Sequence, residues 1–450
     1  MWLVLTTALL IAIAVWSRVL QRSWSAPGAF FALIWVIAAA PTAVLLPDAV
    51  VPGAMLLVAS FVAAVQAGSQ LALYGHEPDV AVVHAPAVHG PNEPPQAATL
   101  AGVTAFLGAC GIAGCVGYVW DAGYQVWQLL DGSVWLEMAV HYSVARYHDD
   151  YVEPVAVHLL LAANYAGSFV GGVLLGTGRG FSKHLFGWLP VVAGSLVTVI
   201  TTAKSAMLMT ALFTLGGWLA FKAAALSERR RKRSLKQWVS LAVILGFIAV
   251  VGTGSLALRY GDGADTDLLT DRVGGYLYGH MAALSAWLTV EDWSHLEPTW
   301  GTLTFAGPFE FLNLTARTTE GLYNPIGLND WAAESNVFTA FRGAITDFGL
   351  FGAWFAAMLL GAFAGRCYGR LRRGDGGTPT AMTGLIFFYS FAAWSPFVSI
   401  LAYNVILLAL VITALTIDVS WSEIRQCIAW SEGEAAPVLP RHLIGKEVES

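Results

Sequence analysis

The segment from Glu334 to Gly365 begins with polar and aromatic residues and continues as an uncharged stretch long enough for a membrane-spanning helix. Arg342 and Asp347 stand where the two parts meet. Charged side chains at the edge of a hydrocarbon layer are costly, and they are functional candidates by default. The alternative is an interfacial anchor whose guanidinium extends into the lipid headgroups.

A second cation, Lys204, stands in TTAKSAMLM (201–209), at the tip of a hairpin between two predicted spans. If a helix begins there, the N–H groups of its first turn lie beside the ammonium, and the two together form an anion site. Lysine and arginine that meet in one pocket suit a pyrophosphate. The alternative is a lysine that extends to the headgroups and binds nothing.

The composition indicates an integral membrane protein. The chain has 450 residues, of which 56% are hydrophobic and 12% are charged, whereas a soluble domain has about 25% charged residues. The four cysteines show no metal-ligand spacing, and we expect no disulfides. We predict an all-α, polytopic fold with about 11 transmembrane helices, at 2–17, 27–46, 53–74, 97–120, 155–177, 185–200, 204–225, 237–257, 345–365, 380–395 and 397–417.

The basic residues indicate the orientation of these spans. The clusters at 18–22, 179–183, 229–233 and 366–373 fall in alternate connections. Lysine and arginine are enriched on the cytoplasmic side, so we expect the N-terminus outside and the C-terminus inside the cell membrane. The single membrane domain, 1–450, then has a cytoplasmic connector (75–96), two outer loops (121–154 and 258–344) and a cytoplasmic tail (418–450).

Only six lysines and arginines remain on the predicted outer side, against the usual bias. Each of them either pairs with an outer acid, such as Asp262 or Asp271, or binds an anionic ligand. The six are Arg146, Lys204, Arg259, Arg272, Arg317 and Arg342.

The predicted outer loop at 258–344 is too aromatic for a solvated linker and too long to lack structure. Within it, 274–290 is a candidate amphipathic helix that carries His280 and Trp287. We expect short helices that lie on, or dip into, the outer half of the membrane. Aromatic rings mixed with amides and acids suit sugar rings, and the alternative is an ordinary interfacial aromatic belt.

The segment HYSVARYHDDYVE (141–153) is aromatic and of mixed charge. Its two histidines, His141 and His148, could be offered as metal ligands, but an irregular loop gives them no fixed geometry. We therefore expect a gating or substrate-contact loop and no metal. The GxSxG, GxxxxGK[ST] and HExxH motifs are absent from the sequence, and we expect neither a cofactor nor a nucleic-acid partner.

The 334–365 segment resembles the one with asparagine, aromatic residues, arginine and Asp-Phe-Gly in the Wzy-type oligosaccharide repeat-unit polymerases of O-antigen, capsule and exopolysaccharide. The upstream segments GYLYGHMAALSAW, GTLTFAGPFEFLN and TTAKSAMLM fall in the expected order, so the resemblance covers most of 155–417. One departure from the family pattern is Lys204, where many relatives have arginine. Lysine does not provide the bidentate phosphate recognition that arginine does.

The resemblance implies metal-independent glycosyl transfer on the outer face of the membrane, between glycans linked to undecaprenyl pyrophosphate. A chain-length regulator and a flippase are the implied partners besides the lipid bilayer. Outer cations would stabilise the leaving pyrophosphate, and a carboxylate or histidine would deprotonate the attacking hydroxyl. For the pyrophosphate we select Lys204, Arg342 and Arg272, then Arg259, Arg317 and Arg146.

Three residues are candidates for the base: His280, Glu334 and Asp347. Each also has a structural alternative. Asp347 could pair with Arg342, His280 could hydrogen-bond within its own helix, and Glu334 could cap a helix N-terminus.

Two other functions stay open. A ligase of the same membrane architecture would transfer the glycan to a different acceptor. A flippase would need polar residues along its spans, whereas here several spans have almost none and the polar residues gather on one side.

The predicted topology can be tested with a membrane-impermeant thiol reagent. A cysteine introduced at position 300 should be labelled from outside intact cells, and one at position 231 should not. The opposite labelling pattern would reverse the orientation.

Overall fold

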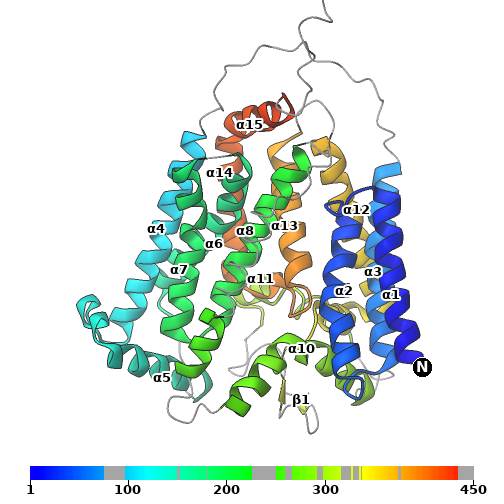
Figure 1. Ribbon diagram of the computed structural model, residues 1–450, viewed down its shortest axis with the longest axis horizontal. Helices are drawn as coiled ribbons and strands as arrows, with labels where there is room; N and C mark the ends of the chain where they lie inside the picture. Colours follow the sequence, from blue (N-terminus) through cyan, green and yellow to red (C-terminus); the bar gives the residue numbers. More distant parts are fainter. Residues whose placement is uncertain are drawn as a thin grey trace, which may run out of the picture.

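The structure is a computed structural model that describes residues 1–74, 97–148, 153–178, 180–225, 250–258, 266–290, 297–315, 326–327, 334–335, 337–372 and 377–433. These residues form an all-helical bundle with one two-residue β pair (Figure 1). The longer helices are α1 (Trp2–Gln21), α2 (Pro27–Leu45), α3 (Pro52–Tyr74), α4 (Ala98–Asp121), α6 (Val155–Gly176), α7 (Phe181–Thr201), α8 (Lys204–Ala224), α12 (Ala340–Arg372), α13 (Pro379–Trp394) and α14 (Asn404–Val419).

Within the described residues, eight helices are long and apolar enough to cross a membrane: α1, α2, α3, α4, α6, α7, α8 and α12. A ninth span is reached if α14 is joined to the start of α15 (Trp421–Gly433), which is bent from it by 67°. The polytopic fold is therefore confirmed, whereas the count of 11 is not. The predicted span at 237–257 lies mostly outside the described residues.

The last predicted hairpin differs from the structure. Helix α13 has only 16 residues, or about 24 Å, which is less than the hydrocarbon thickness of about 30 Å. After Pro396 the chain makes a turn and a 3-10 helix, η5 (Ile400–Ala402), before α14 begins at Asn404. The expected tight turn at Ser395-Pro396 is therefore a longer stretch of irregular backbone, residues 395–403.

Two groups of helices pack on either side of α13 (Figure 1). Helices α1, α2, α3 and α12 form one group, and α4, α6, α7, α8 and α14 form the other. Helix α13 contacts both α2 and α12 of the first group and α8 and α14 of the second. One core therefore joins the whole bundle.

Glycines allow α6 and α8 to approach closely. A Cβ atom added to Gly172 would lie 2.0 Å from the carbonyl oxygen of Thr214, and one added to Gly217 would lie 2.0 Å from that of Phe169. Small residues at such crossings let membrane helices pack backbone to backbone.

Most of the remaining helices lie at the end of the bundle opposite α15, and α11 lies deeper within the bundle (Figure 1). These helices are η1 (Val126–Leu130), α5 (Gly132–His148), α10 (Thr266–Val290) and α11 (Ala306–Phe311). Helix α10 crosses this end of the bundle and packs against α2, α3 and the β pair formed by β1 (Ile326–Gly327) and β2 (Glu334–Ser335). We call this end of the bundle the α10 end. The segment 258–344 thus contains short helices, as expected. The irregular loop expected at 141–153 is wrong for residues 141–148, which belong to helix α5.

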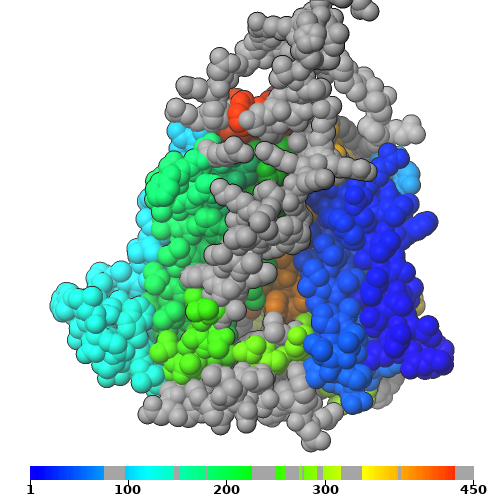
Figure 2. All heavy atoms as spheres, viewed as in Figure 1, coloured from blue at the N-terminus to red at the C-terminus, as the bar shows by residue number. Residues whose placement is uncertain are grey.

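The η1–α5 unit protrudes from the side of the bundle (Figure 2). The hydroxyl of Tyr142 on α5 donates to the carbonyl of Tyr118 over 2.5 Å, which fastens the unit to the end of α4. Trp127 and Leu130 on η1 are exposed. Exposed apolar residues on a short helix beside the bundle suit the membrane interface.

Basic residues lie at the other end of the bundle, beside α15. The carboxylate of Glu423 on α15 accepts hydrogen bonds from the N–H groups of Thr99 (3.1 Å) and Leu100 (3.2 Å), at the start of α4. Lys183 at the start of α7 lies near the same carboxylate. The alternating helices bring to this side the ends that carry most of the other described cations, namely Arg18, Arg22, Lys222, Arg366, Arg370, Arg372 and Arg425, whereas Lys204 and Arg342 lie at the opposite ends of their helices.

Gly172 provides a test of the packing. Gly172→Ala should lower the free energy of unfolding by about 1–3 kcal/mol because its methyl group overlaps the backbone of α8. Gly102→Ala is the matched control, since its Cβ meets no atom within 4 Å, and alanine favours a helix by about 0.5–1 kcal/mol. Thermal unfolding in detergent measures both variants, and equal stability would contradict the α6–α8 contact.

Candidate functional site

Asp347 is fully buried, and its carboxylate holds the turn at 299–304. The carboxylate oxygen Oδ1 accepts from the hydroxyl of Thr299 (2.5 Å) and the N–H of Leu303 (3.1 Å). The other oxygen, Oδ2, accepts from the N–H of Thr304 (2.6 Å). The expected alternative of a pair with Arg342 is therefore wrong, and a carboxylate engaged in this way does not suit a catalytic base.

Helix α12 bends directly after Asp347. Gly349 has a φ of 67°, a left-handed conformation that favours glycine. The first part of α12, residues 340–348, therefore has its own direction at the α10 end. It carries both Arg342 and Asp347.

Arg342 lies between aromatic rings. Its guanidinium carbon is 3.7 Å from the centre of the Phe338 ring and 5.4 Å from that of Trp287 on α10. Both distances allow a cation–π interaction. The neighbouring Phe341 stacks between Trp35 and Phe61, with ring centres 4.4 and 4.3 Å apart. The start of α12 is thus fixed by aromatic packing, and Arg342 is half-buried.

His280 lies two turns before Trp287 on α10 and is only 3% exposed. Its ring centre is 6.1 Å from that of Phe397. The backbone of Ala38 is near the ring, but neither ring nitrogen makes a hydrogen bond of good geometry within the described chain. The expected bond within its own helix is therefore not formed. Burial lowers the pKa of His280 to about 4, so the ring is neutral at pH 7.

Lys204 is the first residue of α8, which confirms that a helix begins there. Two N–H groups of the first turn are already bonded: that of Met207 donates to Thr198 Oγ1 (3.0 Å) and that of Ala206 to the carbonyl of Ala203 (3.2 Å). Fewer donors are thus left for an anion than we expected. Helices α8 and α12, which carry Lys204 and Arg342, pack against each other.

Several predicted site residues are described in part or not at all. Glu334 lies in β2, whose backbone pairs with β1. Its side chain lies outside the described residues, as do those of Arg146, Arg259, Arg272 and Arg317.

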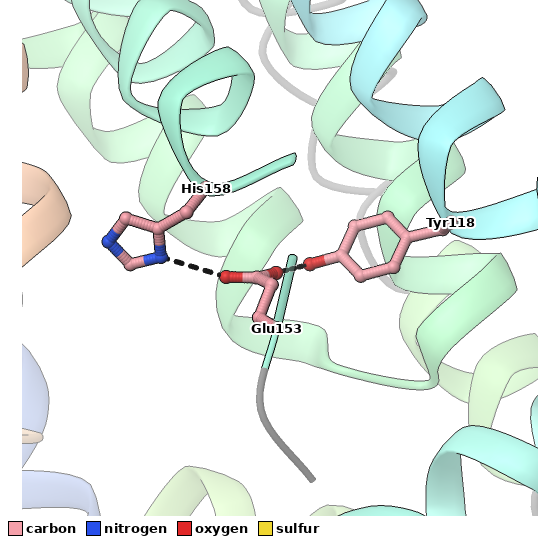
Figure 3. A network of polar contacts seen from close by, with 3 residues as sticks. All are labelled: Tyr118, Glu153 and His158. Atoms are coloured by element: carbon pink, nitrogen blue, oxygen red, sulfur yellow. Dashed lines mark hydrogen bonds and ion pairs between the residues drawn. The ribbon is translucent and has the colours of Figure 1, made fainter. Parts of the chain in front are cut away.

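A polar cluster that we did not predict lies where α4 ends and α6 begins (Figure 3). The hydroxyl of Tyr118 donates to one carboxylate oxygen of Glu153, and Nδ1 of His158 is 2.9 Å from the other. The His158 side chain is 33% exposed and that of Glu153 is 25% exposed. The pair is thus hydrogen-bonded to Tyr118 and partly exposed.

Helices α11 and α14 complete the surroundings of this pair. The side chain of Asn404, the first residue of α14, lies near the His158 ring, and Glu310 on α11 is near enough to act on it electrostatically. Helix α11 packs directly on this point, because a Cβ added to Gly307 would lie 2.5 Å from the backbone nitrogen of Asn404.

A carboxylate, an imidazole and a phenol in contact can hold and move a proton. The sequence carried one signal of this cluster: Glu153 and His158 stand at the mouth of a predicted span, where ionisable residues are functional candidates. The contact with Tyr118 could not be read from the sequence, since it joins a different helix.

Neither the family models nor the curated proteins nor the solved structures contain a match to this chain.

The role of Asp347 can be tested by an isosteric change. Asp347→Asn replaces one acceptor oxygen with an N–H donor that faces the donors of the turn. We expect the protein to lose about 1–3 kcal/mol of stability and limited proteolysis at 299–304 to become faster. The control is Asp418→Asn, an exposed carboxylate at the end of α14. Unchanged cleavage of the turn would show that Asp347 does not anchor it.

Proposed function

We propose that this protein is a membrane glycosyltransferase that polymerises oligosaccharide repeat units linked to a lipid pyrophosphate, with its site at the α10 end. The observation that carries the proposal is the pairing of two features there. A guanidinium lies between aromatic rings on α12 and α10, and α11 packs inside the bundle against the irregular 395–403 segment. Irregular backbone at membrane depth is tolerated where it is buried in protein or lines a cavity.

The distribution of charge supports an outer location for this site. The described cations at the α15 end agree with a cytoplasmic face. The α10 end then faces outward, with the N-terminus outside and the C-terminus inside, at the cell membrane. Lipid-linked glycans that have been flipped across the membrane would meet the protein on that side.

In the proposed reaction, Arg342 binds the pyrophosphate of the donor and stabilises the charge that develops on it as it leaves. A planar guanidinium matches phosphate oxygens, and partial burial strengthens the attraction relative to water. Lys204 at the start of α8 supplies a second positive charge. These cations take the place that a metal ion has in many phosphate-releasing reactions.

Aromatic residues at the same end suit the sugar part of the substrate. Trp300 is 76% exposed and stands on the turn that Asp347 holds. Trp287 and Phe338 flank Arg342. Aromatic faces next to a phosphate-binding cation would place a glycan and its pyrophosphate in one path.

A deletion strain tests the function directly. If the protein is a polymerase, single repeat units should accumulate on the lipid carrier at the outer face, and the wild-type gene should restore long chains. Full-length chains that stay on the lipid would instead indicate a ligase, and units trapped inside would indicate a flippase. Either of these results would contradict the proposal.

In the same strain, Arg342→Ala should insert normally but give products shortened toward single units. The loss of one stabilising donor lowers such rates by about 10²–10³, and Lys204→Ala should shorten the product as well. Arg425→Ala is the matched control, since it removes an exposed arginine at the α15 end. Chain lengths equal to wild type for both Arg342→Ala and Lys204→Ala would remove these residues from the site.

A further inference from the structure

We infer that His158, held by Glu153, is the catalytic base that takes the proton from the attacking sugar hydroxyl. This inference rests on the proposed glycosyl transfer and names the residue that performs its proton step. Glu153 and Tyr118 are positioning residues in this assignment, because they act through His158.

Accessibility separates His158 from Asp347 and His280, two of the three bases expected from the sequence, whereas the side chain of the third, Glu334, lies outside the described residues. Asp347 is fully buried and His280 is 3% exposed, whereas the His158 side chain is 33% exposed. Asp347 is also bonded to three donors of the 299–304 turn. Of these three residues, only His158 offers its ring to a substrate without rearrangement of the helices.

The contacts of Glu153 determine which ring nitrogen can act. One carboxylate oxygen accepts from Tyr118, so the other is directed at Nδ1 of His158, 2.9 Å away (Figure 3). A carboxylate there keeps the proton of the neutral ring on Nδ1. The lone pair is then on Nε2, which points away from Glu153 (Figure 3).

The groups around the ring suit a substrate hydroxyl. The side chain of Asn404 lies near the ring, and its amide can hydrogen-bond to a hydroxyl that approaches the ring. The other titratable groups near the pair are Glu310 from α11 and Tyr165 from α6, which lies near Glu153 and also near Tyr403. The site therefore has an acidic character that favours a positive charge on the ring during the reaction.

The glycosyl transfer forms one bond to the anomeric carbon and breaks another. The acceptor hydroxyl oxygen forms a bond to the anomeric carbon of the donor, and the bond between that carbon and the pyrophosphate oxygen breaks. The pyrophosphate leaves with the electron pair of that bond. The hydroxyl proton moves to Nε2 of His158, whose positive charge Glu153 stabilises, and it is then released to water.

The test uses the full-length protein in membrane vesicles, with lipid-linked repeat units extracted from the deletion strain as the substrate. His158→Ala should lower the polymerisation rate by about 10²–10⁴, and added imidazole should restore part of the rate. Binding of the lipid-linked units should stay close to wild type. His184→Ala on α7 is the matched control, because it removes an exposed histidine at the α15 end.

A second variant keeps the inference testable if His158→Ala does not fold. Glu153→Gln should lower the rate by a smaller factor and move the acidic limb of the pH–rate profile to lower pH, since the amide no longer stabilises a protonated ring. A rate for His158→Ala equal to wild type would overturn the inference. The inference would also be overturned if His158→Ala were slower but not rescued by imidazole and the pH–rate profile of Glu153→Gln were unchanged. Such results would indicate that the two residues have only a structural role.

Failure of the proposed function gives a different result. In that case wild-type vesicles form no polymer from the lipid-linked units, whatever residue stands at 158. Active wild-type protein with an equally active His158→Ala variant would instead leave the polymerase proposal intact and remove His158 alone.

Discussion

The buried carboxylate of Asp347 is the constraint on which the α10 end depends. It binds three donors of the 299–304 turn, and that turn leads directly into α11. Helix α11 in turn packs against the start of α14, beside His158. A single satisfied carboxylate thus connects the part of α12 that carries Arg342 to the part of the bundle that carries Glu153 and His158. An unsatisfied carboxylate at this depth would be strongly unfavourable.

Aromatic packing supports Arg342 from the other side. Phe341 is stacked between Trp35 and Phe61, which ties the start of α12 to α2 and α3. The guanidinium next to it is then directed toward Phe338 and Trp287. Because the bend at Gly349 separates this short segment from the rest of α12, the segment can be positioned by the loop and the aromatic rings instead of by the long span.

Irregular backbone at the α10 end gives the protein a place for chemistry inside an otherwise apolar bundle. In a simple helical hairpin, α13 and α14 would be joined by a tight turn. Here the 395–403 segment, which includes η5, lies between them, and α11 packs against it. Irregular backbone leaves N–H and C=O groups that need partners. The carbonyl of Ser395 accepts from the N–H of Ala340, and the hydroxyl of Ser399 accepts from the N–H of Leu401. Regular spans surround this region and hold it in position.

The sequence by itself determined the class of fold. Its scarcity of charge and its long apolar stretches predicted the observed spans, the helical start at Lys204 and the short helices within 258–344, but not helix α5 within 121–154. It also marked Arg342 and Asp347 as exceptional, because charge near hydrocarbon is visible in one dimension. Only the tertiary structure decided their roles. Asp347 bonds to a turn that lies 43 to 48 residues earlier in the chain, and the Tyr118–Glu153–His158 contact joins two helices. Such contacts depend on which helices are neighbours, and hydropathy carries no information about that.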